Sequence, residues 1–255
     1  MRNDHFSRQA AGYAVYRPTY PRALFDFVAG LAPARRTAWD CATGNGQAAV
    51  GLAPFFDRVV ATDASAAQIA HAHAHPRVEY RVAAAEASGL SSATIDLVTV
   101  AQAAHWLDLD AFYREVRRVL VPGGAIALWS YGSASLDEPA LSAAFGEFEH
   151  VTVGEYWPPE RRLIVEGYLT IPFPFAELRA PRLTLEQRWT LDELLGYVGT
   201  WSASDRFSDA TGLDPVRELD RVLAPLWGAR SRVRNVSWPV AIRAGVVDSS
   251  AVDAA

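Results

Sequence analysis

The chain has 255 residues, of which 50% are hydrophobic, and a formal net charge of −5 at pH 7. This length and apolar content suffice for one large domain with a full core, and the negative charge argues against a general binder of nucleic acids or anionic membranes. Its single cysteine, Cys41, excludes an internal disulfide and is typical of a reducing compartment.

The N-terminal stretch MRNDHFSRQAAGYAVYRPTYP contains no apolar signal core, and no later stretch is long enough to cross a bilayer. We therefore expect a cytoplasmic protein whose partner is a small-molecule substrate rather than a nucleic acid or a membrane. The sequence carries no signal of an oligomeric state.

From about residue 23 onward, segments with the spacing of buried strands alternate with segments that have helical spacing. Such alternation predicts a parallel sheet with helices on both faces. Ser65 is expected to cap one helix, and Pro122-Gly123-Gly124 to end another. The expected strands are 37–41, 58–63, 78–86, 95–102 and 125–131, and the expected helices are 23–32, 47–53, 65–75 and 108–120.

The second half of the chain has a different composition. Residues 133–182 are rich in proline and aromatic residues, and we interpret them as a cap inserted after the fifth strand. Further strands are expected at 182–190 and 236–247, with helices at 191–204 and 214–227, and Pro239 favours an edge position or a bulge. The predicted organisation is a single domain of residues 1–255 with an N-terminal segment or lid (1–34), a cofactor-binding core (35–132), the cap (133–182) and a completion of the sheet (183–247).

A glycine-rich turn follows the first strand, in the stretch TAWDCATGNGQAAVGLA. Gly44-x-Gly46-x-x-Ala49 after a strand, with Asp63 about 20 residues on, satisfies the dinucleotide fingerprint and would indicate an oxidoreductase. Asp40 points to a different ligand, since an acid directly before the loop suits an ammonium group better than a pyrophosphate. The chain also ends in a helix and a strand rather than in a second mononucleotide-binding half.

Several motifs in the same order and spacing resemble the class I S-adenosylmethionine-dependent methyltransferases. They are Asp40-x-x-x-Gly44-x-Gly46, Asp63, Ala85-Glu86 and the Pro-Gly-Gly turn, and they cover residues 35–131. Three further stretches are similar to the small-molecule branch that includes the fungal trans-aconitate methyltransferases, namely YAVYRPTYP (13–21), AHWLD (104–108) and GTWSASDRF (199–207). The resemblance implies an α/β, Rossmann-like methyltransferase fold with a mostly parallel seven-stranded sheet, S-adenosylmethionine as cofactor, and a small acceptor such as a carboxylate.

The resemblance also implies roles for the loop residues. Gly44 and Gly46 would let the backbone approach the cofactor closely, and Asp63 could accept hydrogen bonds from both ribose hydroxyls or simply cap the following helix. Asp40 would favour the positive amino end of the cofactor, directly or through water. The family usually has a glycine where Ala42 stands, and often an acid where Ala84 stands. The remaining expected cofactor residues are Ala85 and Glu86, whose backbone would read the adenine edge, and Gln102.

Aromatic side chains are expected around the acceptor, because aromatic faces attract a sulfonium by roughly 0.5–2 kcal/mol. Trp201 could line this pocket or belong to the core. His105 could act as a general base, donate to the substrate, or simply pack, and Arg17 could hold a carboxylate or make a surface ion pair. The other expected aromatic residues are Tyr13, Tyr16, Tyr20, Trp106, Trp129, Tyr131 and Trp157.

Two readings other than a methyltransferase stay open from the residues alone: a dinucleotide-dependent oxidoreductase, and a cofactor-binding protein without catalysis. A metal site is not expected. His71 and His75 would share a helix face, yet no carboxylate or cysteine cluster accompanies them, which favours a solvated face.

Overall fold

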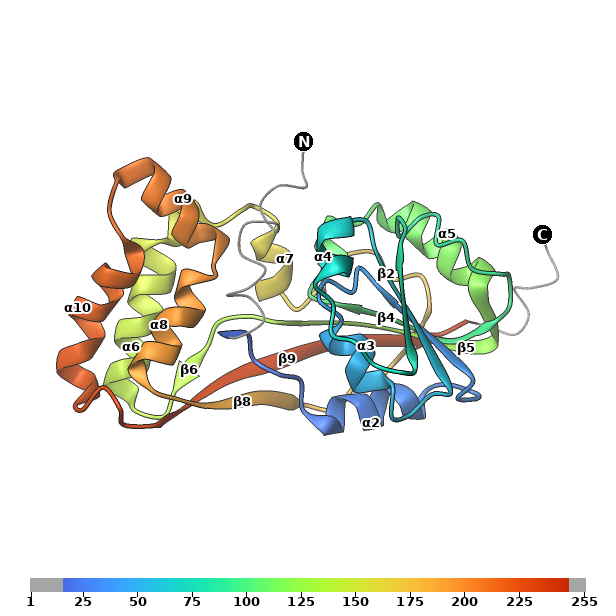
Figure 1. Cartoon of the computed structure of the whole chain (residues 1–255), viewed down its shortest axis with the longest axis horizontal. Coiled ribbons are helices and arrows are strands. Elements are labelled where there is room, and N and C mark those ends of the chain that lie inside the picture. The colour runs from blue at the N-terminus through green and yellow to red at the C-terminus, as the bar shows by residue number, and fades with distance from the viewer. Residues whose placement is uncertain (1–15, 248–255) are drawn as a thin grey trace. The chain divides into compact units, whose positions relative to one another are not determined.

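The computed structural model describes residues 16–247, and Figure 1 labels most of their helices and strands. The chain forms two compact units. The core unit consists of Tyr20–Tyr131, Glu166–Leu183 and residues 240–247, and the helical unit consists of residues 16–19, Gly132–Val165 and Thr184–Pro239. The segment 133–182 is therefore divided between the two units, and its action as a cap stays a prediction.

The core unit is built on five parallel strands in the order β3-β2-β1-β4-β5. β1 and β4 are almost entirely buried, which explains their continuous apolar sequence. β1 and β2 coincide with the expected strands, whereas β3 is four residues shorter than expected. The strands are β1 (Thr37–Cys41), β2 (Arg58–Asp63), β3 (Val78–Val82), β4 (Ile95–Ala101) and β5 (Leu120–Tyr131).

Helices α2 (Arg22–Gly30), α3 (Gln47–Leu52), α4 (Ala66–Ala70) and α5 (Leu109–Val119) belong to the core unit. In this unit α3 packs on β1 and β2, α4 on β2 and β3, and α5 on β5. The amphipathic α5 begins at Asp108, whose side chain accepts a hydrogen bond from the Ala111 amide at 3.1 Å.

The prediction of a helix over 65–75 is wrong in length. Ser65 caps α4 as expected, but the helix ends at Ala70. Beyond it the chain turns away, because the His73 amide donates to the Asn45 carbonyl oxygen at 3.0 Å. His71 and His75 therefore do not share a helix face.

The Pro122-Gly123-Gly124 turn lies inside β5 rather than before it. Ile95 pairs with Leu120 while Leu97 pairs with Ala125, so the β5 side holds three extra residues in a bulge. Gly123 has φ +74°, a left-handed conformation that glycine adopts without strain. The prediction that this turn ends the helix is wrong, because α5 ends at Val119 and β5 begins at Leu120, before the turn.

The helical unit contains most of the second half of the chain. The expected helix 191–204 is two helices, because Trp201 is extended (φ −81°, ψ 138°) and starts a new one. The helix at 214–227 is confirmed, with Asp214 as its cap. The elements are β6 (Ser135–Leu136), α6 (Pro139–Glu147), a π-helix η2 (Phe148–Thr152), the short 3-10 helix η3 (Gly154–Tyr156), α7 (Arg161–Val165), β8 (Leu183–Trp189), α8 (Leu191–Gly199), α9 (Ser202–Thr211) and α10 (Pro215–Trp227).

The last strand, β9 (Arg234–Val246), starts in the helical unit and ends in the core unit. It runs antiparallel to β5 from Val240 onward, and its earlier residues pair with β6 up to Ser237. Pro239, which cannot donate to a ladder, lies between these two paired regions.

The α/β class is confirmed. Residues 16–247 contain nine strands rather than seven, since the sequence predicts neither β6 nor β7 (Ala176–Leu178), which pairs with β9. No helix in this part of the chain is long and apolar enough to cross a membrane.

Candidate functional site

The loop between β1 and α3 makes a sharp, left-handed turn. Ala42, Gly44 and Gly46 all have positive φ values, of +53°, +57° and +84°. The turn is closed by the Gly46 amide, which donates to the Thr43 carbonyl oxygen at 3.0 Å. Ala42 holds this conformation although it carries a Cβ, at the position where the sequence lacks the usual third glycine.

Gly44 and Gly46 serve different purposes. A Cβ on Gly44 would meet only the side-chain oxygen of Gln68, at 4.0 Å, so this face of the loop has room for another group. A Cβ on Gly46 would lie 2.1 Å from the hydroxyl of Tyr80. Tyr80 is not among the site residues that the sequence predicts. Its hydroxyl donates to the His73 carbonyl oxygen at 2.7 Å, and burial raises its pKa to about 12.

Asp40 is fully buried beneath the loop. Its two carboxylate oxygens accept hydrogen bonds from the hydroxyls of Thr43 at 2.5 Å and Thr99 at 2.7 Å. Burial raises its pKa to about 6, against the lowering effect of these hydrogen bonds. Asp40 thus fixes the loop to β4, and because it is fully buried it would act on a bound cation through its charge.

Asp63, the last residue of β2, touches both the loop and the next helix. Its Oδ2 accepts a hydrogen bond from the Gly44 amide at 2.9 Å, and its Oδ1 accepts one from the Ser65 amide at 2.8 Å. The cap of α4 is Ser65 rather than Asp63, so Asp63 does not play the capping role that the sequence left open. It holds the amide of the cap residue and clamps the glycine loop. Each carboxylate oxygen retains a second lone pair for another donor.

The Ala85-Glu86 pair lies in a tight turn after β3, closed by a bridge between Ala84 and Ala87. Ala85 is buried and Glu86 is exposed. The turn is anchored from behind, because Ser88 donates to the buried Glu115 through its amide at 3.0 Å and its hydroxyl at 2.5 Å. These hydrogen bonds hold the backbone of the turn in place, as would be required for its amides to bind a nucleobase.

Gln102 follows β4 in a left-handed conformation, φ +56°. Its amide donates to the Trp129 carbonyl oxygen at 2.9 Å, and its side-chain nitrogen donates to the Tyr131 carbonyl oxygen at 3.0 Å. The side-chain oxygen of Gln102 and the indole nitrogen of Trp129 are both buried and find no hydrogen-bond partner within the described chain. Unpaired buried polar atoms cost about 1–3 kcal/mol each, so these two are candidates for ligand contact.

Trp129 and Tyr131, which the sequence places around the acceptor, are both inside β5 and buried. Tyr20 packs edge-on against them, with ring centroids 5.6 Å and 6.3 Å away. Trp129 is thus covered by an aromatic side chain of the N-terminal segment.

His105 and Trp106 lie in the short 3-10 helix η1 (Ala104–Trp106), just after β4. The Nδ1 of His105 is 2.9 Å from the hydroxyl oxygen of Tyr168, and the two rings stack at 30°. Trp106 is exposed beside it, with its ring 4.7 Å from that of His105. Tyr168 is 63 residues further along the chain, and no sequence pattern indicates this pairing.

In the helical unit, Arg17 donates to the Thr200 carbonyl oxygen at 3.1 Å, and its guanidinium lies 5.6 Å from the ring centre of Tyr197. Tyr16 packs against Gly196, where a Cβ would come within 2.6 Å of its ring. Trp201 is buried against Tyr197, as the core interpretation expects. Tyr13 lies outside the described residues.

A second polar group in this unit involves Glu149, which lies in the π-helix and is almost fully buried. It accepts hydrogen bonds from Ser133 at 3.0 Å and from Arg161. The Arg161 guanidinium lies 3.6 Å from the ring centre of Trp157, which in turn packs on Trp201. We call Arg17, Arg161, Glu149, Trp157, Tyr197 and Trp201 the arginine–aromatic cluster.

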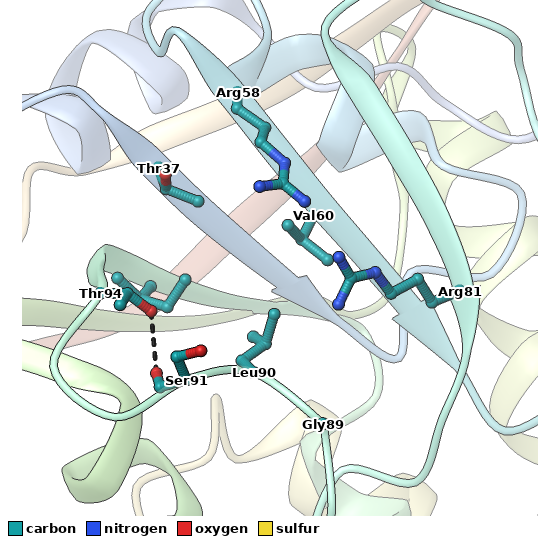
Figure 2. A pocket seen from close by; sticks show the side chains of 9 residues that line it. Thr37, Arg58, Val60, Arg81, Gly89, Leu90, Ser91 and Thr94 are labelled. Atoms are coloured by element: carbon teal, nitrogen blue, oxygen red, sulfur yellow. Dashed lines mark hydrogen bonds between the residues drawn. The ribbon is translucent and has the colours of Figure 1, made fainter.

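A cavity of about 190 Å³ lies elsewhere in the core unit, and Figure 2 shows it. Arg58 and Arg81 point toward it and share the carboxylate of Glu79. Thr37 and Arg58 are the first residues of β1 and β2, so this cavity includes the amino ends of these strands. The predicted cofactor loop follows their carboxyl ends, and its residues do not line the cavity. No group of three His, Cys, Asp or Glu side chains that could hold a metal ion occurs in residues 16–247.

Comparison with known proteins identifies this chain as a methyltransferase. Residues 39–128 match the methyltransferase domain family. A protein of Dictyostelium discoideum named as a methyltransferase is 33% identical over 244 residues, which are 93% of this chain and 93% of that protein. The solved structure of a protein described as a type II methyltransferase from Anaeromyxobacter dehalogenans has 48% identity and a TM-score of 0.87, covering 91% of this chain and 99% of that chain. The YcgJ protein of Bacillus subtilis, at 15% identity and a TM-score of 0.54, covers 89% of this chain and 99% of its own and shares the fold alone.

The residues of the loop fit the cofactor of such enzymes. The open face at Gly44, the carboxylate of Asp63 at the end of β2 and the unpaired oxygen of Gln102 offer a close backbone approach and two acceptors. The comparisons, which give methyltransferases, exclude the interpretation as a dinucleotide-dependent oxidoreductase. The chain belongs to the class I S-adenosylmethionine-dependent methyltransferases, and its cofactor is S-adenosylmethionine.

Proposed function

We propose that the protein methylates a small organic acid on a carboxylate oxygen, in the manner of the trans-aconitate methyltransferases that its sequence resembles. The observation that carries this proposal is the placement of Arg17, whose guanidinium is held by the Thr200 carbonyl oxygen and by the face of Tyr197. An arginine fixed beside an aromatic ring is pre-organised to bind a carboxylate in two-pronged fashion.

The charge of the arginine–aromatic cluster supports the same acceptor class. Two guanidinium groups, of Arg17 and Arg161, accompany one carboxylate, that of Glu149, so these three side chains carry a net positive charge. The walls of the cluster are the rings of Trp157, Tyr197 and Trp201. Positive charge with apolar walls suits a small organic anion better than a neutral phenol.

The cofactor would be held by the core unit. The backbone at Gly44 would face it closely, Asp63 would accept from the ribose hydroxyls, and the side-chain oxygen of Gln102 would accept from the ammonium group. When bound, S-adenosylmethionine supplies a methyl group already activated by its positive sulfur. The chain's residues would then contribute mainly orientation, which can be worth on the order of 7–11 kcal/mol in favourable cases.

Asp63→Ala is expected to weaken S-adenosylmethionine binding by roughly 1–3 kcal/mol, because the ribose hydroxyls and the Gly44 amide would lose a common acceptor. Titration calorimetry with S-adenosylhomocysteine measures the loss. Asp57→Ala, an exposed carboxylate just before the other end of β2, is the matched control. If both variants bind equally well, Asp63 serves only the loop and the helix start.

Arg17→Ala is expected to raise the Michaelis constant for the acid about 10-fold or more with a smaller change in kcat, since its loss removes binding rather than chemistry. The measurement is methyl transfer to a panel of di- and tricarboxylates, including trans-aconitate, and to a matched panel of phenols. Arg22→Ala is the control, because Arg22 is a largely exposed arginine that is close to Arg17 in sequence, belongs to the core unit and pairs with Asp26.

Two outcomes of that panel would contradict the proposal. One is an enzyme that methylates phenols and ignores every carboxylate. The other is tight S-adenosylmethionine binding with no turnover on either panel, as expected of a protein that binds the cofactor without catalysis.

A further inference from the structure

The hydroxyl of Tyr168 meets a histidine of η1. Its oxygen lies 2.9 Å from Nδ1 of His105, which is its only hydrogen-bond partner among the residues that the structure describes. Tyr168 is fully buried, and burial raises its pKa well above the ordinary value. The side chain is therefore a neutral phenol at physiological pH.

The direction of the Tyr168–His105 bond follows from this arrangement. A phenol has one proton to donate, and a buried donor left without an acceptor costs about 1–3 kcal/mol. Among the described residues the acceptor within reach is Nδ1 of His105, so the phenol proton is directed at Nδ1, which must present a lone pair. A neutral imidazole that accepts at Nδ1 carries its own proton on Nε2.

The backbone around Tyr168 is built to hold this ring in place. Tyr168 has φ +61°, a conformation that a tyrosine rarely adopts, and Gly167 before it has φ +62°. Gly167 cannot carry a side chain, because a Cβ there would lie 2.7 Å from that of Ala241. Arg243 donates to the carbonyl oxygens of Tyr168 at 3.0 Å and Ile171 at 2.8 Å. Strained backbone kept by such surroundings is typical of functional sites.

We propose that Tyr168 is a positioning residue that fixes His105 as the Nε2–H tautomer, so that His105 acts on the methyl acceptor as a hydrogen-bond donor and not as a general base. The part about the acceptor rests on the proposed function. A carboxylate needs no base: its oxygen forms a bond to the methyl carbon while the carbon–sulfur bond breaks, the electron pair stays on sulfur, and no proton is released. The Nε2–H group would orient the acid by binding the oxygen that does not attack.

The tautomer of His105 is tested first, by a measurement that needs no methyl transfer. The full chain labelled with ¹⁵N-histidine is examined by NMR, and the His105 signals are assigned by their loss in His105→Gln. We expect a protonated Nε2 and an unprotonated Nδ1 in the native protein, with this preference lost in Tyr168→Phe. Tyr113→Phe is the control, since Tyr113 is an equally buried tyrosine of the same unit that donates to the Pro172 carbonyl oxygen instead. A native His105 protonated on Nδ1 overturns the proposal.

The donor role is tested by kinetics with trans-aconitate or whichever carboxylate the panel identifies. The side-chain nitrogen of glutamine can replace an Nε2–H donor but cannot act as a base. We expect His105→Gln to stay within about 10-fold of the native kcat/KM, and His105→Ala to lose on the order of 10–100-fold, mostly in KM. An equal collapse of kcat in both variants would show a general base. If no carboxylate is methylated, the proposed function fails while the NMR result still decides the tautomer.

Discussion

Gly46→Ala is expected to abolish measurable S-adenosylmethionine binding and to destabilise the core unit by roughly 2–5 kcal/mol. Part of this loss comes from the backbone, since φ is +84° at this position and a Cβ is unfavourable there. The larger part comes from Tyr80, whose hydroxyl would lie 2.1 Å and whose ring carbons would lie 2.8 Å from the new atom. The ring cannot easily move aside, because its hydroxyl is bonded to the His73 carbonyl oxygen.

Thermal unfolding and calorimetry with S-adenosylhomocysteine measure the two effects. Gly89→Ala is the matched control: Gly89 also has a positive φ, +69°, but a Cβ there meets no other atom of the described chain within 4 Å. Adding Tyr80→Ala to Gly46→Ala should recover the steric part of the loss. Equal destabilisation by Gly46→Ala and Gly89→Ala would show that Tyr80 plays no part.

Asp40→Asn is expected to remove a pH dependence of the free energy of unfolding. Burial raises the pKa of Asp40 to about 6 in the folded chain from an ordinary value of 3.8, so the folded state binds a proton more tightly than the unfolded state. Stability is therefore lost as pH rises from about 4 to about 6 and is constant above that range. A difference of about 2 pH units corresponds to about 3 kcal/mol.

Denaturant unfolding of both proteins between pH 4 and pH 7 gives this difference directly. Relative to the native chain, Asp40→Asn should gain about 3 kcal/mol over that range, while its affinity for the positively charged cofactor falls. Thr99→Val removes one hydrogen bond that lowers the pKa of Asp40, so it should move the upper end of the window to higher pH. A native chain that becomes more stable relative to Asp40→Asn as pH rises would contradict the assignment.

The strands that form the centre of the core unit are well predicted because their sequence is self-contained. β1 and β2 are short buried runs bounded by polar residues, and periodicity alone locates both. Two predicted helices have the wrong length, the first because a long-range contact overrides the local pattern. α4 ends early because His73 pairs with Asn45, 28 residues away. The helix expected through 204 breaks at Trp201, shortly after Gly199, the last residue of α8.

In the candidate site, too, residues that are close in sequence are predicted and residues brought together by folding are not. The order of Asp40, Gly44, Gly46 and Asp63 along the chain indicates the cofactor loop, since these residues are close in sequence as well as in space. The sequence does not predict the residues that these four and His105 contact. Tyr80, Thr99 and Tyr168 are each brought to the site by folding, and a lone tyrosine or threonine in a strand or loop carries no pattern that distinguishes it from a packing residue.

The course of β9 has a consequence for how the chain is made. A ribosome would release all five parallel strands of the core unit more than a hundred residues before the segment that pairs with β5, from Val240 onward. Until then the buried residues of β5 from Ala125 to Tyr131 would form an open apolar edge, which is the kind of surface that recruits other nascent chains. This edge of β5 stays open while the helical unit is synthesised, and holdase chaperones are expected to matter most during that interval.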